Sequence, residues 1–205
     1  MDGFQKRKER KKEMIRRAAY ELFSKYGVQK VTIEEIAKKA NVSQVTIYNY
    51  FGSKDELLYN TLRTLTEQTW EDYVKLLESD LPFYEKIENI IFFETKLAGE
   101  LNPDFIRSSL ASNNPDIGEF LDDFYENQVL PSLIDFFKEG QEQGYVNKEL
   151  STKAILFYFN MFKNTPNWVD LLGDEGENAQ LSKELITMFF YGITGQDPQA
   201  DHENS

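Results

Sequence analysis

The stretch QVTIYNYF, residues 44–51, gathers side chains that can contact nucleic-acid bases and phosphates. Its β-branched and aromatic residues favour a strand by propensity, so the stretch is either a strand without a partner or a short helix. On a helix, Gln44 and Tyr48 lie one turn apart on the same face. Val45 and Asn49 repeat that spacing beside them. Two amides, a methyl-bearing residue and a phenol on one outward face are groups that read base edges and touch phosphates.

The residues before this stretch have the pattern of a second short helix and a tight turn. TIEEIAKKA, residues 32–40, opens with Thr32 and Glu35, which fit a capping box, and its apolar residues recur at helical spacing. Asn41 is suited to end this helix because asparagine tolerates the left-handed conformation. Ser43 is suited to cap the helix that follows. Two short helices joined by three or four residues indicate a helix-turn-helix.

Longer helices are predicted on both sides of this pair. A first helix is predicted from about Lys8 to Lys25, with Gly27 as the glycine that ends it. Gly52 is predicted to end the short helix over 44–51. Ser53 then caps a long helix that reaches about Ser79. Further helices are predicted over about 82–99, from Asn102, over 117–143 with a bend near Pro131, over 151–164 and over 179–192. The pattern therefore predicts an all-α protein.

Charge divides the sequence into a basic head and an acidic remainder. Residues 1–54 hold 13 Lys and Arg against 6 Asp and Glu, a balance of +7, whereas residues 55–205 hold 10 against 29, a balance of −19. A basic segment attracts a polyanion, and an acidic one repels it. The run KRKERKK, residues 6–12, extends the basic head, although it also fits a solvated, frayed arm.

Missing residue types argue against several classes of protein. The chain of 205 residues has no cysteine, which excludes disulfides, thiolate catalysis and cysteine-bound zinc. Its only histidine, His202, lies in a polar tail, and no Gly-rich phosphate loop occurs, so we predict no enzyme activity, no cofactor and no metal. There is no signal-peptide pattern at the N-terminus and no apolar run of ~18 residues, so we expect a cytoplasmic protein with no membrane contact.

Residues 16–58, RRAAYELFSKYGVQKVTIEEIAKKANVSQVTIYNYFGSKDELL, strongly resemble the DNA-binding domain of TetR-family transcriptional regulators. The segment TIYNYFGSKDELL looks like the family pattern T-[LI]-Y-x-[HY]-F-x-[SN]-K-x-x-L-[LF], which is long and specific. The resemblance implies three domains or segments: a helix-turn-helix domain with a basic arm over 1–54, a helical ligand-sensing and dimerisation domain over 55–194, and a disordered tail over 195–205. It also implies a homodimer that represses transcription and leaves double-stranded DNA when a small-molecule effector binds.

Matching the family motif residue by residue gives a set of expected DNA contacts. Tyr48 in the recognition helix and Lys54 at the start of the next helix are expected to contact phosphates. Thr32 is expected to cap its helix and to face a phosphate. Thr32 also fits a cap alone, and Tyr50 also fits a core residue, whereas we expect no core role for Gln44, Tyr48 or Lys54. The full predicted set is Thr32, Ser43, Gln44, Val45, Thr46, Tyr48, Asn49, Tyr50 and Lys54.

The rest of the chain is rich in aromatic residues, which fit either core packing or the walls of an apolar pocket. The predicted ligand-binding residues are Trp70, Phe92, Phe93, Phe105, Phe124, Tyr125, Gln128 and Asn160. We expect a flat or greasy effector, and the acidic charge of the domain leaves a cationic one open. An alternative is that the acidic domain binds a protein partner while the head holds DNA.

Wide apolar stripes on the last two predicted helices fit a dimer interface, as the resemblance implies. The predicted interface residues are Ile155, Phe159, Phe162, Leu181, Leu185, Met188 and Phe189. The same stripes also fit the core of a monomer. A dimer is favoured because two half-sites require two heads.

Overall fold

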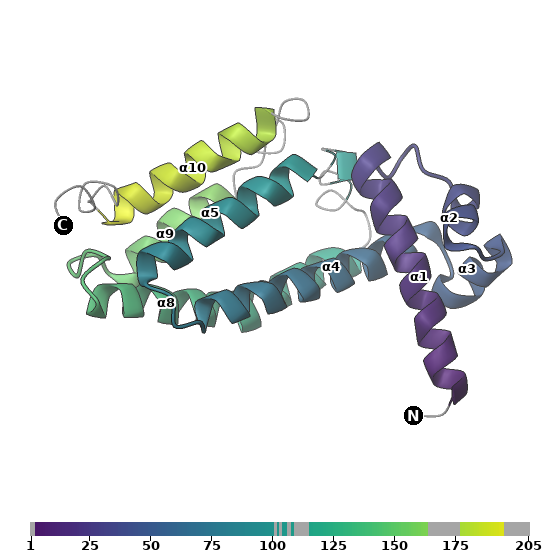
Figure 1. Cartoon of the computed structure of the whole chain (residues 1–205), viewed down its shortest axis with the longest axis horizontal. Helices are drawn as coiled ribbons and strands as arrows, with labels where there is room; N and C mark the ends of the chain where they lie inside the picture. The colour runs from purple at the N-terminus through teal and green to yellow at the C-terminus, as the bar shows by residue number, and fades with distance from the viewer. Residues whose placement is uncertain are drawn as a thin grey trace. The chain divides into compact units, whose positions relative to one another are not determined.

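The computed structural model describes residues 3–100, 102, 104, 105, 108, 115–163 and 177–194, and every element in these ranges is helical. This confirms the predicted all-α fold. Within the described ranges, no helix is both long and apolar enough to cross a membrane. The elements, labelled in Figure 1, are α1 (Gly3–Tyr26), α2 (Ile33–Ala40), α3 (Gln44–Phe51), α4 (Lys54–Leu77), α5 (Phe83–Glu100), α7 (Pro115–Phe124), the π-helical segment η1 (Tyr125–Val129), α8 (Leu130–Glu142), α9 (Thr152–Lys163) and α10 (Glu177–Thr194).

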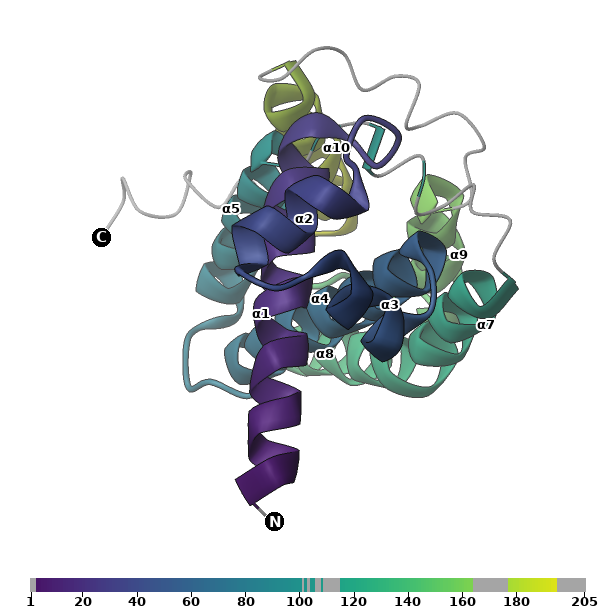
Figure 2. The ribbon, with the colours of Figure 1, turned by 90° about the vertical axis from the view of Figure 1, so that its right-hand side faces the viewer.

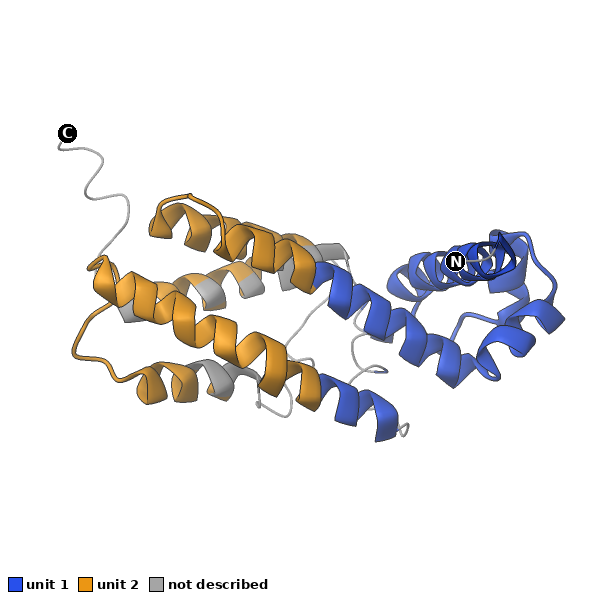
Figure 3. Cartoon of the chain, turned by 90° about the horizontal axis from the view of Figure 1, so that it is seen from below, with its two compact units in different colours: residues 1–69, 100–121 blue, residues 70–99, 122–205 orange. Residues whose placement is uncertain are grey.

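The chain divides into two compact units, coloured in Figure 3. Unit 1 comprises residues 1–69 and 100–121, and unit 2 comprises residues 70–99 and 122–205. The division falls within α4, whereas the predicted functional boundary lies after residue 54, at the start of that helix. The units are defined by contacts and the predicted domains by function, so the functional division stays a prediction.

Unit 1 is built around the apolar stripe of α1, on which α2, α3 and α4 pack (Figure 2). Ile15, Ala19 and Phe23 are each 0% exposed, and they meet Ile36 of α2 and Ile47 of α3, which are also 0% exposed. A surface ion pair of 2.8 Å between Lys39 and Glu21 joins α2 to α1 outside this core. Hydrogen bonds, first from Lys39 and then from Arg17, lower the pKa of Glu21. The apolar spacing predicted for these helices is confirmed.

Residues with positive φ end α1, α2 and α3 where the sequence predicts. Gly27 and Gly52 both have φ of 81°, and Asn41 has φ of 54°. After α2, Asn41 N–H donates to Lys38 O at 3.3 Å and Val42 N–H donates to Ala37 O at 3.0 Å, while Val42 packs on the core. These two bonds satisfy carbonyls that have no partner within the helix, and the left-handed residue makes them possible. The predicted turn between α2 and α3 is confirmed.

Helix α1 begins earlier than predicted, at Gly3 instead of about Lys8. The basic run that also fitted a frayed arm is therefore helical. Lys, Arg, Glu and Gln are all strong helix formers, and the pairs Lys12–Glu9 at 3.7 Å and Arg16–Glu13 at 2.7 Å are spaced to support the helix. Repulsion among the positive charges of residues 6–12 is therefore weaker than the helix propensity of these residues and their ion pairs.

Unit 2 has its own core of aromatic rings. Phe83 of α5, 1% exposed, stacks on Phe136 of α8 with ring centroids 4.5 Å apart and on Tyr145 at 5.6 Å. A tight turn after α8 places Tyr145 on these rings. In this turn, Tyr145 N–H and Val146 N–H both donate to Gly140 O, at 2.9 and 3.0 Å. Gly144, with φ of 84°, makes that reversal possible.

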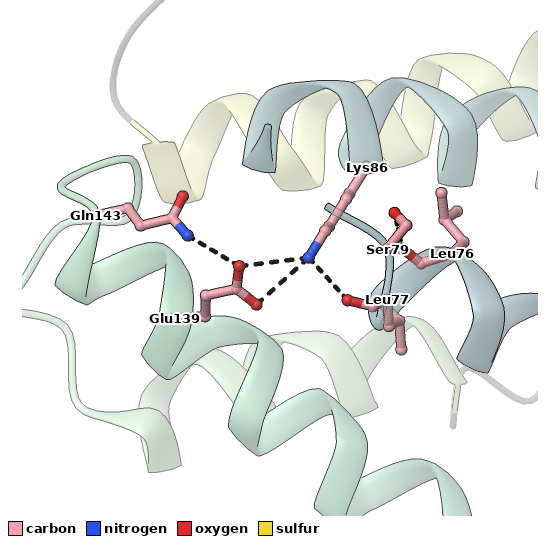
Figure 4. Close-up of polar contacts among 6 residues, drawn as sticks. All are labelled: Leu76, Leu77, Ser79, Lys86, Glu139 and Gln143. Atoms are coloured by element: carbon pink, nitrogen blue, oxygen red, sulfur yellow. Dashed lines mark hydrogen bonds and ion pairs between the residues drawn. The ribbon is translucent and has the colours of Figure 1, made fainter. Parts of the chain in front are cut away.

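A buried lysine joins three elements of unit 2 (Figure 4). Lys86 of α5 is 3% exposed, and its Nζ donates to Leu77 O at 2.7 Å, at the end of α4. The same Nζ lies 3.3 and 3.5 Å from the two carboxylate oxygens of Glu139 on α8, which also accepts from Gln143 Nε2 at 2.8 Å. Ser79 Oγ donates to Leu76 O at 2.6 Å beside it. These donors satisfy carbonyls that the last turn of α4 leaves without helical partners.

The predicted long helix over 117–143 is interrupted by η1 just before Pro131. Leu130 N–H donates to Tyr125 O, five residues back, which defines the π-helical turn. Proline has no N–H and its ring collides with the carbonyl four residues earlier, so a wider turn before it removes the conflict. The sequence indicated a disturbance at Pro131, and the structure places it at residues 125–129.

Candidate nucleic-acid interface

Helix α3 has one buried face and one outward face, as the wheel predicts. Ile47 is 0% exposed in the core of unit 1, whereas Val45 is 65% and Tyr48 is 48% exposed. Gln44 and Asn49 are also exposed. The outward face of α3 thus carries a methyl-bearing side chain, a phenol and two amides, which are groups that can contact base edges and phosphates. The helix reading of the opening stretch is confirmed, and the strand reading is wrong.

Three other predicted contacts of α3 have structural partners. Ser43 Oγ accepts from Thr46 N–H at 3.1 Å, which caps the helix, and lies 2.8 Å from Thr46 Oγ1. Tyr50 is half-buried and packs on the core of unit 1. Their predicted roles on DNA stay predictions, and the exposed face of Gln44, Val45, Tyr48 and Asn49 is the part of α3 that is open to a ligand.

Thr32 forms the predicted capping box of α2. Its Oγ1 accepts from Glu35 N–H at 3.2 Å and donates to Glu35 Oε2 at 2.8 Å, while Thr32 N–H donates to the same oxygen at 2.7 Å. The backbone bond from Thr32, followed by the side-chain bond, lowers the pKa of Glu35. The hydroxyl is thus already used as donor and acceptor, so its predicted phosphate contact needs the cap to open or a backbone N–H to donate instead.

Lys54 has a structural role that the sequence did not indicate. Its Nζ donates to Val28 O at 2.6 Å, which ties the first turn of α4 to the loop after α1. Burial, partly offset by Asp55 and Asp104, lowers the pKa of this half-buried ammonium. Lys54 therefore has a structural hydrogen bond, although it is not among the residues of the unit 1 core. Its predicted phosphate contact remains open, because an ammonium has three donors.

Replacing Lys54 with methionine is expected to lower the free energy of unfolding by about 1 kcal/mol, since a charged hydrogen bond to a part-buried carbonyl is lost. Urea unfolding at one fixed protein concentration measures the change. The control is Lys30→Met, which removes the same charge from an exposed site in the same unit. Equal stability of the two variants would show that the bond to Val28 contributes nothing.

A distant segment also holds the loop after α1. Asn102 N–H donates to Ser24 O at 2.8 Å, and Asp104 Oδ2 accepts from Gln29 N–H at 3.3 Å. Phe105, 2% exposed, stacks on Phe23 with centroids 6.3 Å apart. This corrects the assignment of Phe105 to a ligand site, because its ring is part of the core of unit 1. Residues 75 or more positions apart carry no shared spacing, so sequence patterns could not reveal these contacts.

All the other predicted ligand-binding residues belong to unit 2. Trp70, half-buried, lies 6.2 Å from Phe124 and 6.3 Å from Tyr73, whose ring lies 6.4 Å from Phe93 (centroid distances). The Trp70–Phe124 and Tyr73–Phe93 contacts are edge-on, the Trp70–Tyr73 contact is tilted, and together they join α4, α5 and α7 through an aromatic cluster. Phe92 is 62% exposed beside it. Tyr125 is half-buried and Gln128 exposed in η1, while the side chain of Asn160 lies outside the described residues.

The predicted dimer residues separate into core and surface. Ile155 is 2% and Phe189 is 5% exposed, and Phe189 stacks on Tyr158 at 5.4 Å within the core of unit 2. These two assignments are corrected, since both side chains are already covered by their own chain. Met188 is 64% exposed, and Leu181 and Leu185 are half-buried. The side chains of Phe159 and Phe162 lie outside the described residues.

Comparison with known proteins agrees with this geometry. Residues 15–59, which span α2 and α3, match the family model of bacterial regulatory proteins, tetR family. The HTH-type transcriptional regulator YhgD of Bacillus subtilis strain 168 is 33% identical over 179 residues, 86% of this chain and 90% of that protein.

Two solved structures share the fold. A transcriptional regulator from Saccharomonospora viridis in complex with choline has a TM-score of 0.70 at 18% identity, covering 90% of this chain and 98% of that one. The regulator FadR from Bacillus subtilis in complex with stearoyl-CoA has a TM-score of 0.63 at 20% identity, covering 88% and 98%.

Proposed function

Because this chain belongs to the TetR family of DNA-binding transcriptional regulators, we propose that it is a cytoplasmic repressor with a palindromic operator. It binds the operator as a homodimer and leaves it when a small apolar or aromatic molecule binds unit 2. Family members bind DNA and small-molecule effectors and are typically dimers.

The single observation that carries the DNA half of the proposal is the outward face of α3. Gln44, Val45, Tyr48 and Asn49 are exposed together on a helix of 8 residues whose other face is locked into the core. A helix fits the major groove, where amides pair with adenine and a valine methyl contacts thymine. The described part of unit 2 carries mainly acidic side chains on its surface, which repel a polyanion.

Dimerisation is supported by exposed apolar side chains on the last two helices. Phe157 is 69%, Met161 54% and Met188 64% exposed. Phe157 and Met161 are one turn apart on α9, so they share a face. Covering such side chains with a second copy removes apolar surface from water and brings two heads to one palindrome.

The effector half of the proposal rests on the aromatic cluster around Trp70. The two ligand-bound regulators with the same fold hold choline and stearoyl-CoA, so a cation and a long acyl chain are both reasonable first probes. A second candidate function keeps the DNA-binding head but gives the acidic unit 2 a basic protein as partner. The exposed acidic residues of α7, including Asp122 and Asp123, are the observation that favours it.

We further propose that α4 transmits the effector signal. Helix α4 begins at Lys54, directly after α3 ends at Phe51, and its residues 70–77 belong to unit 2. An effector that moves the Trp70 end of α4 therefore moves the start of the same helix beside α3. A coupling free energy of about 1–3 kcal/mol is enough to release DNA over a useful effector range.

The experiment that tests the function is selection of bound fragments from the source genome by the purified full-length protein, followed by sequencing. One inverted repeat upstream of a transporter or enzyme operon is the expected result. Many scattered sites away from promoters would instead favour the protein-partner function. No enrichment of any sequence would contradict sequence-specific binding altogether. Choline and stearoyl-CoA are then tested for release of the protein from the enriched fragment.

On the selected fragment, Gln44→Ala and Tyr48→Ala are each expected to weaken binding about tenfold, since one base or phosphate contact is worth ~1–3 kcal/mol. Fluorescence anisotropy with labelled duplex measures the dissociation constant at fixed salt. The control is Asn127→Ala, which removes an exposed amide from unit 2. Unchanged binding by both α3 variants would show that the outward face of α3 does not read DNA.

A further inference from the structure

We propose that the N-terminal half of α1 is a second DNA-contacting surface, in which Lys8, Lys11 and Lys12 hold the phosphates that flank the operator. We call these three residues the arm stripe. The inference rests on the proposed operator binding and adds a surface that lies outside the helix-turn-helix.

The N-terminal part of α1 is helical and carries no buried residue before Ile15. Helix α1 is continuous from Gly3 to Tyr26. In both views of unit 1, the N-terminal part of α1 runs on past α2 and α3 (Figures 1 and 2). About twelve residues at 1.5 Å each extend roughly 18 Å, which equals about five base pairs of duplex.

The three lysines of the arm stripe lie on one face of α1. Lys8, Lys11 and Lys12 precede the core residue Ile15 by seven, four and three positions, so they continue the face of α1 that packs on α2 and α3. Lys8 and Lys12 are half-buried, unlike their neighbours. Lys6 and Arg10 precede Arg17 by eleven and seven positions, and Arg17 is 79% exposed on the opposite face.

The partner of the arm stripe is the DNA that flanks the operator. A duplex that lies against the outward face of α3 and continues past unit 1 runs along the side of α1 to which the arm stripe points. A helix with side chains is about 10–12 Å wide and the minor groove about 6 Å, so a helical arm stays outside that groove and meets phosphates. Lysine is a point-charge donor suited to that contact.

The experiment compares two variants that each lose two positive charges from the same helix. Lys8→Gln/Lys11→Gln alters the arm stripe, and Lys6→Gln/Arg10→Gln alters the opposite face. Lys12 is left in place because it pairs with Glu9 at 3.7 Å. Binding of the full-length proteins is measured against salt concentration on the genome-selected site, once with 15-base-pair flanks and once trimmed to the inverted repeat.

For a dimer, loss of two stripe charges per protomer is expected to reduce the slope of log K against log salt by about 3–4, on the flanked duplex only. The opposite-face variant should change the slope by less than about 1. Equal reductions for both variants, or an undiminished effect on the trimmed duplex, would overturn the proposal.

A stripe variant that binds DNA normally but loses binding to phosphatidylglycerol vesicles would assign the arm to a membrane surface and also overturn it. If no genomic site is selected, the proposed operator binding is contradicted. If a site is selected but the salt slopes of the stripe variant are unchanged, only the proposed role of the arm stripe is contradicted.

Discussion

Replacing Gly140 with alanine is expected to lower the free energy of unfolding of unit 2 by about 3 kcal/mol. A Cβ at position 140 would lie 2.5 Å from Phe83 Cζ, 2.6 Å from Phe83 Cε2 and 2.7 Å from Val146 Cγ2. Neither neighbour can yield easily, because Phe83 and Val146 are each 1% exposed and the Phe83 ring is stacked on Phe136. The gain of ~1 kcal/mol from placing alanine in a helix is smaller than this overpacking cost.

Urea unfolding followed by tryptophan fluorescence, at one protein concentration, measures the effect of Gly140→Ala. The matched control is Gly118→Ala in α7, where the added Cβ has no atom within 4 Å. That variant should be stabilised by about 0.5–1 kcal/mol, since it gains helix propensity without a collision. A Gly140→Ala protein as stable as the control would mean that the α5–α8 contact relaxes freely.

The parts of the fold that follow from local rules were predictable from sequence. The capping box at Thr32, the left-handed Asn41 and Gly27, and the two faces of α3 depend on residues within one or two helical turns. The residues that determine these features are therefore close together in the sequence. The same holds for the outward face of α3, because its side-chain types were unusual for a solvated helix.

Contacts between distant segments were not predictable in this way. Lys54 on Val28 O and Asp104 on Gln29 N–H join residues 26 and 75 positions apart, so no periodicity records them. Aromatic residues raise a related difficulty, since burial in a core and exposure at a site use the same residue types. Phe105 and Phe189 were expected at functional surfaces, and each is instead closed in by rings of its own unit.

Replacing Glu139 with alanine is expected to cost about 2–3 kcal/mol of stability, because Lys86 is left as a buried charge with Leu77 O as its remaining acceptor among the described contacts. The cost is less than the 3–5 kcal/mol of a pair buried on both sides, since the Glu139 side chain is 38% exposed and that of Lys86 only 4%. The loss should appear as a lower urea midpoint at one protein concentration.

The double variant Lys86→Met/Glu139→Ala provides the decisive comparison. It removes the buried charge together with its partner, so it should be more stable than Glu139→Ala alone by about 1 kcal/mol or more. Lys86→Met alone should cost about 1–2 kcal/mol, because Leu77 O at the end of α4 loses its donor. If the double variant is instead the least stable of the three, the two residues act independently, and the lysine stabilises α4 through the Leu77 carbonyl without help from Glu139.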